Sequence, residues 1–145
     1  MIDTTITFTA YGLPKGQPRP RAFARGGRSA VYDPGTAEGW KGQIAIAAKA
    51  WENQRHDQPF QVFLKFLMPR PKAHYTSKGL RPTAPKWFTG KPDADNLAKA
   101  VLDALTQIGI WKDDSLVVSL LATKEFSETP GCEVVIVPLF ATSPS

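Results

Sequence analysis

Apolar and polar residues alternate along four short segments of the chain. In the first, Ile6, Phe8 and Ala10 share one face and threonines occupy the other. A period of two with β-branched and aromatic residues is typical of strands that are buried on one face. The pattern predicts strands at residues 4–11, 60–68, 115–126 and 133–140.

Two other segments repeat their apolar residues every three or four positions, which is typical of amphipathic helices. The first covers residues 36–53, where Trp40, Ile44 and Trp51 recur. The second covers 95–108 and ends at Gly109, a residue that favours a helix C-terminus. Strands and helices in this order predict an α+β fold, a small mixed sheet with two main helices packed on it.

The length and composition indicate one soluble domain. A chain of 145 residues with 42% hydrophobic residues can bury a core unaided. We expect residues 1–140 to form this domain and 141–145 to be a polar tail. One cysteine, Cys132, and two histidines exclude a disulfide scaffold and a zinc finger. No signal peptide or apolar run of roughly 18 residues is visible, so a cytoplasmic protein without a membrane partner is expected.

Charge is divided unevenly along the chain. Residues 1–92 carry 15 basic and 5 acidic side chains, a net +10, whereas residues 93–145 carry 3 basic and 8 acidic ones, a net −5. The basic side chains are concentrated in two loops rich in glycine and proline, 12–34 and 69–92. The second loop also holds Tyr75, Trp87 and Phe88. Such a division suits a protein that attracts a polyanion and holds a divalent cation beside it, although a solvated surface of mixed charge is the alternative.

The densest chemical signal is the segment KPDADNLAKAVLDAL at 91–105. Asp93 and Asp95 stand where a loop enters the second helix, a place where aspartate commonly caps the helix or complements its dipole. Carboxylates are also the ligands that Mg²⁺ prefers. Lys99 and Asp103 follow on the same helix face, either as part of a site or as an ordinary ion pair of neighbouring turns.

A second acidic pair, Asp113 and Asp114, follows that helix in the segment WKDDS. It is either a plain turn or a source of a further carboxylate. Because the link between helix and strand is short, we expect their near ends to be neighbours and Asp114 to join Asp93 and Asp95. Three converging carboxylates repel one another unless a cation neutralises them, so this cluster would imply a divalent metal.

These residues resemble the pattern of RusA-like Holliday junction resolvases. The pattern is D-x-D-N-L-x-K-x-x-x-D-A-L followed by G-x-W-x-D-D, here Asp93–Leu105, Gly109, Trp111, Asp113 and Asp114. The segments QPRPR and VYDPGTAEGW resemble the upstream parts of the family more weakly.

The resemblance implies a homodimeric endonuclease that cuts four-way DNA junctions symmetrically in recombination and repair. It uses Mg²⁺, for which Mn²⁺ can substitute. It makes Asp93, Asp95 and Asp114 the metal-binding catalytic acids and Lys99 the essential lysine, while Asp113 is either a helper ligand or a cap for the loop. Candidate DNA contacts in the basic segments and on the second helix are Lys15, Arg19, Arg21, Arg25, Arg28, Lys91 and Lys99.

Two other functions fit part of this sequence. A metal-dependent nucleotide-sugar transferase could use D-A-D, but the chain is short and lacks a glycine-rich phosphate loop. A DNA-binding protein without catalysis, or one with another preference among branched DNAs, would explain the basic loops. It would not explain acids beside a DNA surface, because unneutralised carboxylates repel phosphate.

Overall fold

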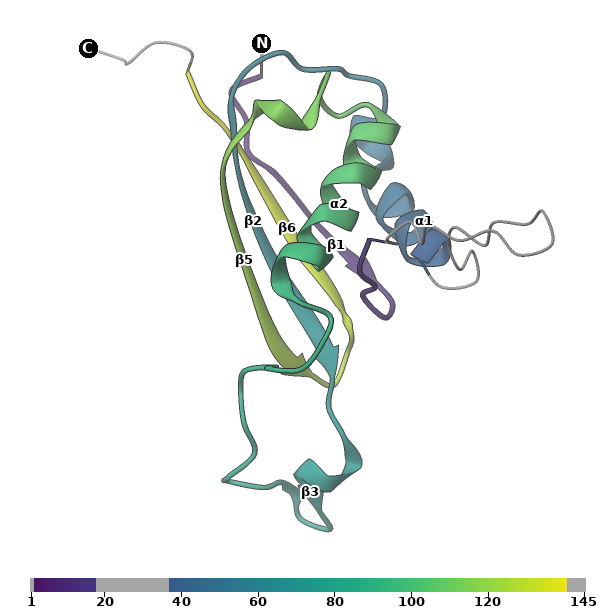
Figure 1. Ribbon diagram of the computed structural model, residues 1–145, viewed down its shortest axis with the longest axis vertical. Helices are drawn as coiled ribbons and strands as arrows, with labels where there is room; N and C mark the ends of the chain where they lie inside the picture. Colours follow the sequence, from purple (N-terminus) through teal and green to yellow (C-terminus); the bar gives the residue numbers. More distant parts are fainter. Residues whose placement is uncertain (1, 18–36, 141–145) are drawn as a thin grey trace, which may run out of the picture.

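The computed structural model describes residues 2–17 and 37–140 (Figure 1). The main elements are β1 (Ile6–Tyr11), α1 (Ala37–Ala47), β2 (Phe60–Pro69), α2 (Ala94–Ile108), β5 (Val117–Ser127) and β6 (Gly131–Pro138). Between them lie three 3-10 turns and a two-stranded hairpin, namely Lys49–Trp51, Lys72–His74, Asp114–Leu116, β3 (Tyr75–Thr76) and β4 (Gly79–Leu80). No helix in the described ranges is long and apolar enough to cross a membrane.

The four long strands form one mixed sheet in the order β1-β6-β2-β5. β6 pairs antiparallel with both β1 and β2, while β2 and β5 run parallel. The sheet therefore has β1 and β5 at its edges. Both main helices pack on one face of this sheet (Figure 1), which confirms the predicted α+β class.

The core lies between this face and the helices, and the strand alternation of the sequence places it there. Phe60, Val62, Leu64, Phe66 and Met68 of β2 are all buried, whereas the residues between them face the other way. The helices supply buried residues from one stripe each, mainly Trp40 and Ile44 from α1 and Leu97, Ala98, Val101, Ala104 and Leu105 from α2.

The first helix ends earlier than its apolar period predicts. α1 stops at Ala47, and a 3-10 turn follows at Lys49–Trp51. Beyond it Asn53 and Arg55 take left-handed backbone angles, with φ of 62° and 51°. The amides of these two residues donate to the carbonyls of Ile108 and Gly109, at 2.9 and 2.8 Å. The chain thus leaves the helix because its backbone pairs with the carboxyl end of α2.

The second helix is the crossover between two parallel strands, and this fixes where its ends lie. A parallel connection must return the chain along the length of the sheet. α2 therefore begins at the end of the sheet where β2 finishes, and it ends where β5 begins (Figure 1). Gly109 closes it with φ of 81°, a left-handed conformation that glycine adopts without steric cost.

Residues 70–91, called the basic arm below, extend from the end of the sheet where α2 begins (Figure 1). The arm contains six Lys and Arg residues and no acid. Two of them support its own structure: Arg70 donates to the Pro85 carbonyl at 2.9 Å and lies over the Phe126 ring, and Arg81 donates to the Ala73 carbonyl at 2.9 Å.

Candidate active site

Two exposed carboxylates stand at the start of α2. Asp93 occupies the N-cap position with φ of −70° and ψ of 153°, but its side chain makes no capping hydrogen bond. Asp95 lies in the first turn. Asp93 therefore has the backbone position of a helix cap but not the side-chain hydrogen bond of one. Both carboxylates are exposed to solvent.

Lys99 lies one turn along the same helix and is exposed. Within the described ranges it forms no ion pair with Asp95 or Asp103, so the alternative of an ordinary helical ion pair has no support. Asp103 is used elsewhere: its Oδ2 accepts from the Lys41 ammonium of α1 at 2.6 Å, and the Lys41 side chain is only 8% exposed. Asp103 thus joins the two helices rather than the site.

Lys124 of β5 is a site residue that sequence reasoning missed. Its ammonium donates to the carbonyls of Gly90 and Pro92, at 2.7 and 2.9 Å, and lies 5.2 Å from the centre of the Phe88 ring. These carbonyls lie three positions and one position before Asp93, so Lys124 holds the loop that enters the start of α2. The available signal was a charged residue between Ala122 and Phe126, on the face of β5 that should be apolar.

The first basic segment is attached to the same helix end. The Gln17 amide donates to the Asn96 carbonyl at 3.2 Å. A Cβ on Gly16 would overlap the side-chain amide of Asn96, so a larger residue here would require that side chain to move. The neighbouring Lys15 is half-buried. This contact explains how a loop distant in sequence reaches the vicinity of Asp95.

The expected cluster of three carboxylates is not formed within one chain. Asp113 and Asp114 lie after the carboxyl end of α2, whereas Asp93 and Asp95 lie at its start, about 22 Å away for a helix of 15 residues (Figure 1). No group of three or more His, Cys, Asp or Glu residues in the described part of the chain could hold a metal ion. The prediction of convergence was wrong because the short link brings Asp114 close to Ile108, at the opposite end of the crossover helix from Asp95.

Asp113 has the surroundings of a turn residue. The Ser115 hydroxyl is the main influence that lowers the pKa of its carboxyl, and the backbone amides of Ser115 and Asp114 add to this effect. The Leu116 amide donates to the Asp113 carbonyl at 3.1 Å. Asp113 has the backbone position of an N-cap before the 3-10 turn, but, as at Asp93, its side chain makes no capping hydrogen bond, so both roles that the sequence left open for it stay predictions.

The predicted DNA contacts divide into two groups. Arg19, Arg21, Arg25 and Arg28 lie outside the described residues. Lys15, Lys91 and Lys99 are described, and Lys91 and Lys99 are exposed at the end of the sheet that carries Asp93 and Asp95. The structure therefore brings these lysines and two of the predicted acids to one end of the molecule.

The three aromatic residues of the basic arm have different surroundings. Phe88 packs on Phe126 with ring centres 5.3 Å apart, and the Tyr75 hydroxyl donates to Glu128 at 3.4 Å. Trp87 is 52% exposed, and the Lys86 ammonium lies 4.7 Å from its ring centre. Of the three, Trp87 is the one available for stacking on a base.

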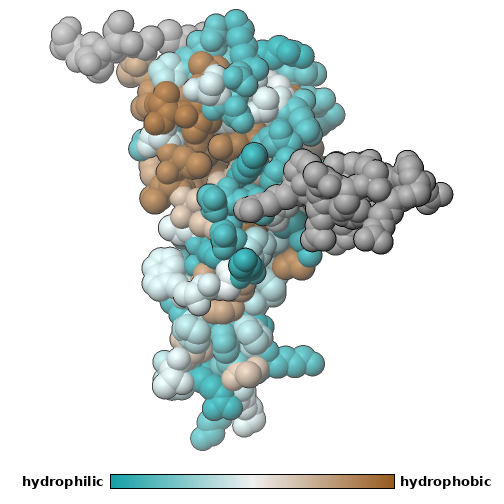
Figure 2. Space-filling model, viewed as in Figure 1, coloured by the Kyte–Doolittle hydropathy of each residue, from teal (hydrophilic) through white to brown (hydrophobic). Residues whose placement is uncertain are grey.

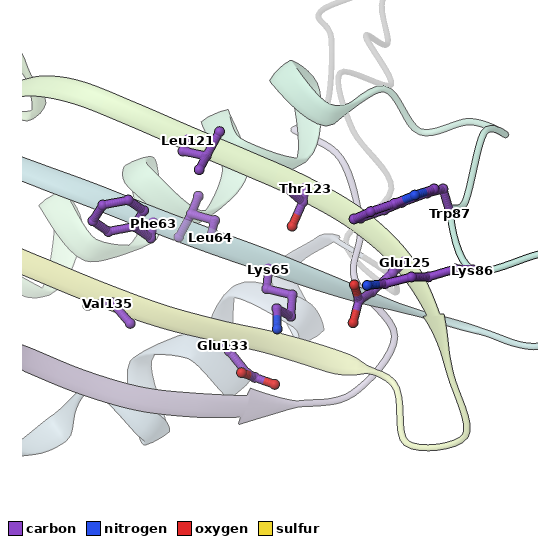
Figure 3. A pocket seen from close by; sticks show the side chains of 10 residues that line it. All are labelled: Phe63, Leu64, Lys65, Lys86, Trp87, Leu121, Thr123, Glu125, Glu133 and Val135. Carbon is purple, nitrogen blue, oxygen red and sulfur yellow. The ribbon is translucent and has the colours of Figure 1, made fainter.

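A hollow of about 400 Å³ lies on the sheet face opposite the helices. Figure 3 shows its apolar part formed by Phe63, Leu121 and Val135, with charged side chains at the other part, namely Lys65, Lys86, Glu125 and Glu133. Asp93 and Asp95 belong to the helix layer, so this hollow is separate from the carboxylates.

Comparison with known proteins identifies the family to which the chain belongs. Residues 12–137 match the family model described as Endodeoxyribonuclease RusA. The chain is 38% identical over 135 residues to the protein named "Uncharacterized protein YqaN" of Bacillus subtilis (strain 168), with 90% of this chain and 94% of the relative covered. The chain therefore belongs to the RusA endodeoxyribonuclease family.

Proposed function

We propose that this protein is a Mg²⁺-dependent, structure-specific endodeoxyribonuclease that resolves four-way DNA junctions by paired symmetric nicks, in recombination and repair. The observation that carries the proposal is the placement of Asp93 and Asp95 at the end of the sheet from which the basic arm extends. Family membership supports the same reaction. Carboxylates beside a positively charged surface that binds DNA are compatible with that binding when they hold a metal cation, because the cation neutralises their charge.

The residues at this end fit Mg²⁺, or Mn²⁺ in its place. Mg²⁺ commonly takes one or two carboxylates and completes its shell with waters and substrate phosphates. Asp93 and Asp95 supply two carboxylates on neighbouring positions, both accessible to solvent. Bound there, the ion would polarise the scissile phosphate and lower the pKa of a water.

The protein's own cations would act on the phosphate directly. Lys99, exposed on the same helix, contributes positive charge to the phosphoryl oxygens as a mobile point charge. Lys124 holds the two carbonyls before Asp93 and so fixes the direction in which the carboxylates point. These roles make Lys99 a catalytic residue and Lys124 a positioning residue.

The basic arm would bind the DNA backbone. Its four lysines, Lys72, Lys78, Lys86 and Lys91, are exposed, whereas its arginines are occupied by contacts within the arm. Lysines that contact phosphates release counterions and make affinity depend on salt. Trp87 can stack on an unpaired base at the centre of a junction.

Two active sites are required for paired nicks, and one chain offers one start of α2. A two-fold dimer places identical sites across a substrate that itself has two-fold symmetry. We therefore propose that the protein acts as a homodimer.

The deciding experiment incubates the purified protein with a synthetic four-way junction, a matched duplex and a flap, with and without Mg²⁺. We expect paired nicks in the junction only, and only with the metal. Equal cutting of all three substrates would indicate a general nuclease. Binding of the junction without cutting under both Mg²⁺ and Mn²⁺ would contradict the proposal in favour of a binding protein.

A further inference from the structure

The hollow on the outer face of the sheet, the face opposite the helices, is bounded at one end by the return segment of the basic arm. The Phe88 amide donates to the Lys124 carbonyl at 3.1 Å, and Trp87 forms an antiparallel bridge with Glu125. Residues 86–88 therefore lie along β5 as a short strand. Because of this pairing, the sheet itself fixes the backbone that carries Trp87.

Neighbouring residues of this short strand direct their side chains to opposite faces of the sheet. Phe88 packs on Phe126, on the face covered by the helices, with ring centres 5.3 Å apart. Trp87 instead lines the hollow beside Leu121 and Thr123, as Figure 3 shows. Trp87 is half exposed, so the core does not use this ring. An indole that is held in place but left uncovered is suited to stack on a flat ligand.

The surface around Trp87 is apolar on one side and basic on the other. Val118, Leu120 and Leu121 of β5 are exposed. Figure 2 shows apolar residues gathered along the sheet, above a basic arm that is mostly hydrophilic. Trp87 joins the two, because it belongs to the arm and pairs with β5. A ligand that contacts this ring would therefore combine a flat apolar part with an anionic part.

The hollow has the size and the chemical groups for such a ligand. Its volume of about 400 Å³ lies within the range of about 300–1,000 Å³ that is usual for small-molecule sites. Phe63, Leu121 and Val135 form its apolar part (Figure 3). Thr123 and Glu125 add a hydroxyl and a carboxylate, which can form hydrogen bonds with the polar edge of a base. A nucleobase matches this set, because it has flat apolar faces and a polar edge.

Lys86 supplies a cation for the phosphate of a nucleotide. Its ammonium lies 4.7 Å from the centre of the Trp87 ring, and it forms no ion pair within residues 2–17 and 37–140. An ammonium over an exposed ring is held only weakly, so a bound phosphate can draw it away and free the ring for a base. The other lysine of the hollow, Lys65, stands directly opposite Glu133 on β6, so these two charges offset each other.

We propose that the hollow binds one unpaired nucleotide of the DNA, with its base stacked on Trp87 and its phosphate beside Lys86. This binding does not require cleavage. The source of the nucleotide, a junction with unpaired bases at its centre, rests on the proposed function.

The hollow and the carboxylates are connected by a short segment of chain. Trp87 lies six positions before Asp93, and Lys124 holds two carbonyls of the loop between them. This segment passes along the edge of the sheet, from the outer face to the start of α2. Lys91 in the segment is exposed and can contact an intervening phosphate. One DNA strand would therefore reach both the hollow and the carboxylates.

Such a site would favour branched DNA over duplex. A base within a duplex must leave its stack before it can enter a pocket, whereas a base that is already unpaired costs less to extract. Stacking on an aromatic ring stabilises the extracted base whatever its identity. The hollow would therefore contribute to the choice of substrate and leave the chemistry to Asp93 and Asp95.

A thermodynamic cycle between Trp87 and single nucleotides tests the site without cleavage. Junctions with one abasic nucleotide at or near the branch point are titrated with protein in EDTA, and binding is followed by fluorescence anisotropy. For the wild type, one abasic position should weaken binding about 10-fold, as for the loss of one stacked base. W87A should bind the intact junction about 10-fold more weakly and not respond to that position, because both changes remove the same contact. W87F should restore most of the response.

L80A is the matched control, because Leu80 of the basic arm is 50% exposed and does not line the hollow. It should keep the wild-type affinity and the wild-type response to the abasic position. Equal abasic effects in the wild type and W87A, or no effect at any position, would overturn the proposal. So would an equal loss of affinity for a matched duplex in W87A, since Trp87 would then contact paired DNA.

A second pair of variants alters the hollow and leaves Trp87 in place. L121E puts a carboxylate in the hollow, where it repels a phosphate, whereas V118E adds the same charge to β5 outside the hollow. L121E should lose the response to the abasic position and V118E should retain it. A wild-type response in L121E would overturn the proposal. A wild-type dimer that L121E converts to a monomer in sedimentation velocity would assign this face to a second copy and overturn it too.

Failure of the proposed function gives a different result from failure of the nucleotide site. A wild-type protein that responds to the abasic position but cuts no DNA with Mg²⁺ would refute the nuclease and support the site. A wild-type protein that cuts junctions, with W87A responding to the abasic position as the wild type does, would support the nuclease and refute the site.

Discussion

Aspartates lie near both ends of α2. The two ends differ in how many of their polar groups form hydrogen bonds within the protein. At the start, Asp93 and Asp95 are exposed and the Asp93 side chain makes no capping bond. At the end, Gly109 closes the helix with bonds to its last carbonyls, and the Trp111 ring nitrogen donates to the Thr106 hydroxyl at 2.8 Å. The start of α2, called the open end below, therefore keeps exposed carboxylates without a capping bond, whereas the protein itself completes the other end.

We expect the polarity of the adjacent helix to decide which of the aspartates can bind a ligand. The helix N-terminus carries partial positive charge, which stabilises carboxylates and attracts phosphate. In sheets with parallel strands, binding sites occur at the carboxyl ends of those strands, which is where a crossover helix begins. Asp93 and Asp95 lie there, whereas Asp113 and Asp114 lie after the opposite end of α2.

The largest effect should come from removing one carboxylate at the open end. D95N should lower junction cleavage by about 10³-fold or more, because a bound metal ion contributes several kcal/mol to the transition state. Junction binding, measured by fluorescence anisotropy, should change little. D113N is the control, since Asp113 lies after the carboxyl end of α2, away from Asp93 and Asp95. Wild-type cleavage by D95N, or an equal loss in D113N, would remove the distinction between the two ends.

Removal of the lysine beside the acids should come next. K99A should lose about 10²-fold in cleavage, as for loss of one group that stabilises developing charge, and should melt at the wild-type temperature. K112A is the control, because Lys112 is an exposed lysine near the other end of α2 and pairs with Asp57 at 2.8 Å. A large drop in the K99A melting temperature, followed by circular dichroism, would instead indicate a structural ion pair.

A smaller effect is expected where the protein positions the open end. K124M keeps most of the side-chain volume but loses two charge-assisted hydrogen bonds, so we expect a loss of about 1–2 kcal/mol in unfolding free energy. Cleavage should fall about 10-fold because the carboxylates are less well oriented. K65M, on the opposite face of the sheet, should change neither. Urea titrations and initial rates test the two effects separately, and an unchanged cleavage rate in K124M would contradict its positioning role.

The smallest effect concerns binding alone. The double variant K86Q/K91Q removes two exposed charges from the basic arm and should reduce the slope of log affinity against log salt by about 2, since each phosphate contact contributes roughly 0.9. K49Q/K112Q removes two charges distant from the arm and should leave the slope unchanged. Equal slopes in both variants would place the DNA surface elsewhere.

Sequence reasoning predicted the elements well because they depend on local periodicity. The second helix was expected at 95–108 and runs from Ala94 to Ile108, and the four long strands occur near their predicted positions. The end of α1 was missed, because it depends on hydrogen bonds from Asn53 and Arg55 to residues more than 50 positions away.

The site was harder to predict because nearness along the chain differs from nearness in space. Asp114 follows α2 after a short link, so it seemed natural to place it with Asp95. The pairing of β2 with β5 decides otherwise, and nothing in the local pattern shows that these strands are parallel. Lys124 was overlooked for a related reason, because its partners are two loop carbonyls that carry no sequence signal.

The strands that support the basic arm determine how far the arm extends from the sheet. The arm rises from Pro69 at the end of β2 and returns through residues 86–88 along β5, so its two supports are continuations of the sheet. Adding two residues to both supports would move the arm outward by about 7 Å and preserve its orientation, while adding one would turn it over. Strand length would therefore set how far the basic arm extends from the sheet, while Asp93 and Asp95 stay at the start of α2.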